Sequence, residues 1–134
     1  MKPHLLLIVL ILLLTGCRQS AQPTPTPDLG ATPEPDIRID MAVEPSPPTV
    51  GEATLVVRLH SPTGDPIAGA QIRVRGDMNH AGMRPVLGDA VETETGVYRV
   101  PFEWTMGGEW IVTLDVTLND GQHFLREFTM SVTT

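Results

Sequence analysis

The chain has 134 residues, of which 41% are hydrophobic and 4% aromatic, and its formal net charge is -7 at pH 7. This length suits one small domain with appended segments. The negative charge argues against a nucleic-acid partner, because a protein that contacts phosphate backbones is expected to be basic. A single cysteine excludes an internal disulfide bond.

Residues 1–16 have the pattern of an export signal. Lys2 gives a positive start, residues 5–14 form an apolar run, and Leu14-Thr15-Gly16-Cys17 follows. The run is too short to span a bilayer as a mature helix. The segment resembles a bacterial lipoprotein signal helix, which implies cleavage before Cys17, lipidation of Cys17 and a mature protein that is lipid-anchored to the cell membrane and faces outside the cytoplasm. A plain secretory signal and an uncleaved anchor are the alternatives.

Residues 17–36 follow as a lipidated cysteine and a proline- and threonine-rich linker. Repeated prolines among threonine and acidic residues cannot form a core and favour an extended polyproline-II chain. We predict a disordered tether, which at ~3.1 Å per residue reaches roughly 50–60 Å.

Residues 37–134 are expected to fold as one domain. Apolar and polar residues alternate with period two, which predicts strands, and no stretch shows sustained helical spacing. About seven short strands separated by turn signals predict an immunoglobulin-like antiparallel β-sandwich, an all-β fold, with Trp104 and Trp110 anchoring its core. Arg126 falls on the apolar side of the last run, so its burial is left open. The alternating runs are residues 37–43, 55–60, 72–75, 86–92 (a poorer run), 98–103, 110–117 and 124–132.

The loop between the third and fourth runs has an unusual composition. Loops favour Gly, Pro, Asn, Asp and Ser for backbone reasons, but this loop contains Met78, His80 and Met83. Strand direction places it at the same end of the sandwich as the turn that contains Met106. His60 and His123 are predicted to lie at the opposite end.

Thioether sulfur and imidazole are soft or borderline ligands. The set Met78, His80, Met83 and Met106 therefore suits Cu(I), whereas Mg²⁺ and Ca²⁺ require oxygen ligands and zinc normally takes thiolates or more histidines. The alternative is packing: Met78 fills the core, Met106 contacts a tryptophan, and His80 is an exposed loop residue.

The order of these motifs resembles the YtkA-like domain over roughly residues 50–132. The resemblance implies an extracytoplasmic β-sandwich, often lipid-anchored and related to FixH-like membrane proteins that are linked to copper-oxidase assembly. In many relatives a proline stands beside the loop methionine, whereas here Asn79 and Ala81 flank His80. The matching residues are Gly64, Pro66, Ile67, Gly69 and Ala70, then Met78, His80, Gly82 and Met83, then Gly96 and Tyr98, and finally Met106, Gly108 and Trp110.

Two functions follow as hypotheses. The first is a membrane-tethered module that binds Cu(I) for copper handling or oxidase assembly, with a copper protein or an oxidase assembly factor as its partner. The second is a non-metal structural or protein-interaction domain of an envelope complex. An enzyme is not expected, because the chain has no Gly-x-Ser-x-Gly motif or phosphate loop and Cys17 is assigned to lipid. Four acidic residues are interpreted as solvated: Glu92, Glu94, Asp115 and Asp120.

Overall fold

The computed structural model describes residues 36–80 and 82–134. The predicted signal helix, Cys17 and nearly all of the predicted tether lie outside these residues. The described part contains eight strands and no helix: β1 (Arg38–Glu44), β2 (Gly51–His60), β3 (Gln71–Met78), β4 (Val86–Asp89), β5 (Val91–Glu94), β6 (Val97–Trp104), β7 (Gly108–Thr117) and β8 (His123–Val132).

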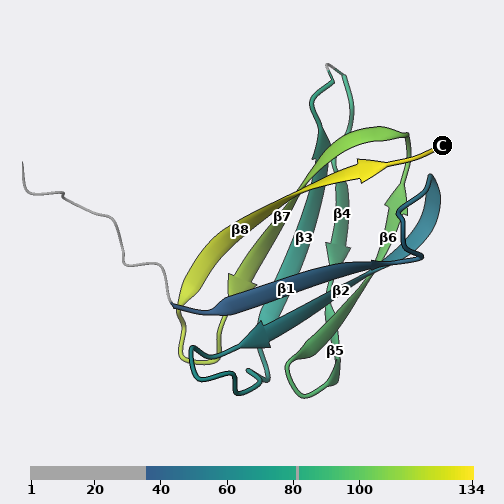
Figure 1. The fold of residues 1–134 in the computed structure, drawn as a ribbon. Helices are drawn as coiled ribbons and strands as arrows, with labels where there is room; N and C mark the ends of the chain where they lie inside the picture. The colour runs from purple at the N-terminus through teal and green to yellow at the C-terminus, as the bar shows by residue number, and fades with distance from the viewer. Residues whose placement is uncertain (1–35, 81) are drawn as a thin grey trace, which may run out of the picture. The chain divides into compact units, whose positions relative to one another are not determined.

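The strands form two antiparallel sheets of four strands each, which confirms the predicted sandwich (Figure 1). One sheet has the order β1-β2-β6-β5 and the other has the order β4-β3-β7-β8. The poorer run at 86–92 is divided between the two sheets, because β4 pairs with β3 whereas β5 pairs with β6. Ala90 connects them, and its N–H donates to the Ile72 carbonyl at 2.9 Å. The predicted seven strands therefore become eight.

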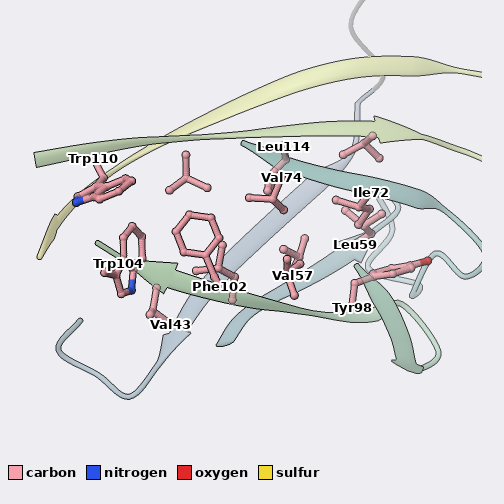
Figure 2. Packing of buried hydrophobic residues seen from close by; sticks show 14 of the residues in the cluster. Val43, Val57, Leu59, Ile72, Val74, Tyr98, Phe102, Trp104, Trp110 and Leu114 are labelled. Carbon is pink, nitrogen blue, oxygen red and sulfur yellow. The ribbon is translucent and has the colours of Figure 1, made fainter. Parts of the chain in front are cut away.

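Alternating side chains from both sheets fill the core, as the period-two pattern predicts. In β6, every second residue from Tyr98 to Trp104 is buried. Figure 2 shows Trp104 and Trp110 together at one end of the core, Phe102 beside them and Tyr98 at the other end. The Trp104 ring centroid lies 4.8 Å from that of Phe102 and 5.3 Å from that of Trp110, both in edge-to-face geometry. Such pairs contribute about 0.5–1.5 kcal/mol beyond area burial.

Close approach of the two sheets explains a glycine in the middle of β3. A Cβ atom on Gly76 would lie 2.5 Å from Cζ of Phe102, which belongs to the facing sheet. Glycine normally weakens a strand. Here it makes room for an aromatic ring that packs against the strand.

The sandwich has two ends, which we name after one residue each. The Tyr98 end consists of residues 61–70, 95–96 and 118–122, and β1 begins beside it, since Arg38 pairs with His60. The Met106 end consists of residues 45–50, 79–80, 82–85, 105–107 and 133–134. At the Met106 end, Thr133 forms a parallel bridge to Thr49, and Val50 N–H donates to the Thr133 carbonyl at 2.9 Å.

Residues 32–134 form a compact unit of their own. The buried hydrophobic cluster runs from Val43 to Val132 and therefore lies entirely within this unit. A fragment of these residues contains the whole buried cluster that the described residues form. Arg126 faces inward on β8 and is half-buried, with its guanidinium carbon 6.0 Å from the ring centroid of Phe124. Within the described residues, no helix has the length and apolarity needed to cross a bilayer.

Candidate functional site

The strand registers bring the predicted loops to one end of the molecule. Met78 pairs with Trp110 and Gly51 pairs with Trp104, so the segments that follow β3, precede β7 and precede β2 all lie at the Met106 end. In Figure 1 the β3–β4 loop and the β6–β7 turn lie on the same side of the sandwich. His60 and His123 border the opposite end, where β2 finishes and β8 starts. The prediction that the β3–β4 loop and the β6–β7 turn share one end of the sandwich, opposite to His60 and His123, is confirmed.

Met78 lies in the core. Its side chain is 9% exposed, and it faces inward in the same cross-strand row as Trp110. A Cβ atom on Gly108 would lie 2.9 Å from Cε of Met78, so the thioether packs against the backbone where β7 begins. This arrangement is the gap-filling role that a flexible methionine performs in cores.

His80 lies on the other side of the same sheet. It lines a hollow of about 290 Å³ together with Asn79, Glu109 and Ile111. Glu109 and Ile111 flank the inward-facing Trp110 on β7 and therefore point away from the core. The structure brings Met78 and His80 to the same end of the sandwich but to opposite faces of one sheet.

Met83 and Met106 lie on the loops themselves. Met83 N–H donates to the His80 carbonyl at 3.4 Å, which closes a turn, and the Met83 side chain packs half-buried against the core. Met106 is 44% exposed, and its carbonyl accepts a 3.0 Å hydrogen bond from Trp110 Nε1. A buried tryptophan thus fixes the backbone at Met106 and leaves the thioether accessible.

The second tryptophan of this end has an unusual environment. Trp104 is fully buried, and its Nε1 has no hydrogen-bond acceptor among the described residues. Such an orphan donor costs about 1–3 kcal/mol. This end of the core therefore contains one indole with a hydrogen-bond acceptor, that of Trp110, and one without, that of Trp104, and Met78 packs beside Trp110.

Conventional metal ligands do not gather in the described part of the chain. Residues 36–80 and 82–134 contain no group of three or more His, Cys, Asp or Glu side chains placed to hold a metal ion. A metal site at the Met106 end would therefore depend on thioether sulfur, with His80 as its imidazole.

At the Tyr98 end, side chains hold the backbone of the loop before β3, an arrangement that was not predicted from the sequence. The Tyr98 hydroxyl donates to the Ile67 carbonyl at 2.8 Å and accepts from Ala70 N–H at 3.0 Å. Glu92, which we interpreted as solvated, accepts from Gly69 N–H at 2.9 Å and from Gly96 N–H at 3.0 Å. Glu92 is exposed, as interpreted, and its carboxylate in addition binds backbone groups of two separate segments.

Burial raises the pKa of the Tyr98 hydroxyl above its ordinary value of 10.0. The hydrogen bond from Ala70 N–H acts in the opposite direction, and the neighbouring Glu92 carboxylate adds to the rise. The hydroxyl is therefore a neutral structural group at physiological pH. The sequence feature that could have indicated the contact of Tyr98 with Ile67 and Ala70 was the Gly-x-Tyr pattern at Gly96 and Tyr98, which follows the glycine- and proline-rich segment 64–70.

Comparison with known proteins identifies the family. The YtkA-like family model matches residues 34–115, more than half of the chain. The chain belongs to the YtkA-like family. The match covers both ends of the sandwich and stops within β7 of this YtkA-like domain. No curated protein matches the chain.

One solved structure is similar to the YtkA-like domain in outline. It is described as the ZirS C-terminal domain and has 14% sequence identity, with 90% of each chain covered and a TM-score of 0.46. The residues that carry the sequence resemblance divide between the two ends: Gly69, Ala70 and Tyr98 make backbone contacts at one end, and the methionines and His80 belong to the other.

Proposed function

We propose that this YtkA-like protein is a lipid-anchored, extracytoplasmic module that binds Cu(I) at the Met106 end, with a copper protein or oxidase assembly factor as its partner. The observation that supports the proposal is that two loops distant in sequence, which bear Met83 and Met106, lie at the same end of the sandwich. The exposed thioether of Met106 favours a soft monovalent cation, and the described residues hold no group of three or more conventional metal ligands that would favour a harder ion. A binding role is proposed rather than a catalytic one.

The placement of the side chains favours the loop residues as ligands. Met106 is exposed on a turn whose carbonyl is fixed by Trp110, and Met83 is joined to His80 by the turn hydrogen bond. Met78 is already packed against Gly108 and would have to leave the core to bind an ion. We therefore propose Met83, Met106 and His80 as the principal donors, with Met78 as the packing residue beneath them.

The anchor fits this arrangement because the described chain begins next to the Tyr98 end, where Arg38 pairs with His60. A tether attached there leaves the Met106 end on the far side of the sandwich from its attachment point. Replacing Cys17 with serine is expected to abolish incorporation of labelled fatty acid and to move the protein from the membrane fraction to the soluble fraction. Retention of the Cys17→Ser variant in membranes would contradict lipid anchoring.

Copper binding is tested by competition under reducing conditions. The 32–134 fragment is titrated against a complex of Cu(I) with a chromophoric chelator, and loss of the complex's absorbance measures transfer of the metal. The double variant Met106→Leu/His80→Ala is expected to bind at least about tenfold more weakly, equivalent to about 1.4 kcal/mol. Leucine conserves the volume of methionine without its sulfur.

The matched control is Met41→Leu/His123→Ala, which removes the same two side-chain types away from the Met106 end. This control should retain wild-type affinity. If the wild type fails to compete for Cu(I), or the control variant loses as much affinity as the test variant, the copper proposal is wrong.

A second candidate function follows from the burial of Met78. If this residue and Met83 serve packing, the Met106 end presents a loop surface to another envelope protein without any metal. In that case the 32–134 fragment takes no Cu(I) from the chelator. A partner recovered by cross-linking on the cell surface is then lost when Met106 or His80 is substituted, but not when Met41 or His123 is substituted.

A further inference from the structure

A groove on the side of the sandwich has features of a binding surface that the copper proposal does not use. It has a volume of about 640 Å³ and lies between β4 and the part of β6 nearest the Met106 end. Its apolar lining is Ala53, Val86, Leu87, Pro101 and Phe102, and its acidic lining is Glu44, Glu52 and Glu103.

The groove exists because the chain changes sheets at Ala90. β5 pairs with β6 only from Val97 to Arg99, so the rest of β6 has no hydrogen-bonded strand on that side. β4 approaches there instead, and a Cβ atom on Gly88 would lie 2.7 Å from Val100 Cγ1. Leu87 on β4 is left 70% exposed at the rim.

Pro101 has no N–H to offer a new strand, so backbone pairing along this edge is interrupted there. Its carbonyl oxygen faces β4, 3.1 Å from where a Cβ atom on Gly88 would lie. Recognition in the groove must therefore depend on side chains.

The carboxylates set the charge of the occupant. Glu44 already pairs with Arg99 at 2.8 Å. Glu52 and Glu103 are direct cross-strand neighbours, and neither has an ion-pair or hydrogen-bond partner within the described residues. Like charges placed opposite one another destabilise a sheet, and a cation between them would remove this repulsion.

We propose that the groove binds an arginine-containing extended segment of a partner protein, with the guanidinium between Glu52 and Glu103 and an adjacent apolar side chain against Leu87 and Phe102. Charge complementarity supports this occupant. Residues 36–134 contain seven arginines and fourteen acidic residues, so they account for the whole formal charge of -7. A guanidinium has donors in a planar fork that can serve two carboxylates at once.

The test uses the 32–134 fragment and a fluorescein-labelled hexapeptide that alternates arginine and leucine. Fluorescence anisotropy should show saturable binding that weakens as salt rises from about 0.05 to 0.3 M. The Glu52→Gln/Glu103→Gln variant is expected to bind about tenfold more weakly, and Leu87→Ser should also weaken binding. The substituted side chains are exposed, so the fold should be retained.

The matched control is Glu109→Gln/Glu127→Gln, which removes two exposed carboxylates from the other sheet. This control should bind the hexapeptide as the wild type does. The proposal is overturned if the wild type does not bind, if the control loses as much affinity as the groove variant, or if arginine amide alone competes as well as the hexapeptide. The last result would mean that the groove holds only a small cation.

Discussion

The two ends of the sandwich are held in different ways. At the Tyr98 end, side chains bind the backbone of the loop before β3 at several points: Tyr98 contacts Ile67 and Ala70, Glu92 contacts Gly69, and Asn119 Nδ2 donates to the Ala68 carbonyl at 3.1 Å. At the Met106 end, the β3–β4 loop is closed by a long 3.4 Å turn hydrogen bond and by packing of Met83. Binding loops are drawn from the less stable parts of a fold, so the contrast favours the β3–β4 loop as a binding loop.

The largest expected difference between the ends concerns two glycines with similar backbone geometry. Gly69 has φ +72° and Gly82 has φ +84°, so alanine is strained at both, by about 1 kcal/mol. A Cβ atom on Gly69 would also overlap the Asn119 amide, which is held by Ala68, whereas Gly82 has open space. Gly69→Ala should therefore lower the free energy of unfolding by about 3 kcal/mol and Gly82→Ala by about 1 kcal/mol.

Urea unfolding of the 32–134 fragment measures both changes. Equal losses at the two positions would show that the loop before β3 adapts as easily as the β3–β4 loop. The contrast between the ends would then not hold.

A smaller difference is expected from removing one functional group at each end. Tyr98→Phe deletes the hydroxyl that bonds Ile67 and Ala70, and it should cost about 2 kcal/mol because two part-buried backbone groups lose their partner. Met106→Ala removes an exposed side chain and should change stability by less than about 0.5 kcal/mol. A Tyr98→Phe variant as stable as the wild type would contradict the role given to the hydroxyl.

The pH dependence of stability provides the control for this substitution. The pKa of Tyr98 is raised in the folded protein, so the folded state binds its proton more tightly than the unfolded chain does. The associated stability is fully present below the unfolded pKa of about 10 and is lost as pH rises through the folded value. The difference in stability between the wild type and Tyr98→Phe should therefore narrow above about pH 10.

The sandwich could be predicted from the sequence for two reasons. Period-two alternation indicates which side chains face the core, and turn residues indicate where each strand ends. The sequence also predicted that the β3–β4 loop and the Met106 turn share one end, since this follows from strand direction alone. The division of 86–92 was not predictable, because two four-residue strands in different sheets give too short a pattern to separate from one irregular run.

The candidate site was less predictable than the fold. Residues two apart in a strand share a face, so Met78 and His80 would lie together if β3 continued. Instead β3 ends at Met78, and the chain bends at Asn79 and His80, which places the imidazole beside Glu109 on the outer face. The contacts of Glu92 were also hidden, because its partners Gly69 and Gly96 are backbone groups that leave no charge pattern in the sequence.

The bridge between Thr133 and Thr49 determines where an affinity tag can be attached. A Cβ atom on Gly107 would lie 2.8 Å from Cγ2 of Thr134, so the last residue is next to the Met106 turn. A polyhistidine tag fused there would put additional imidazoles within reach of Cu(I) and would obscure the affinity of the protein's own ligands. A cleavable tag ahead of β1 would lie at the opposite end of the sandwich.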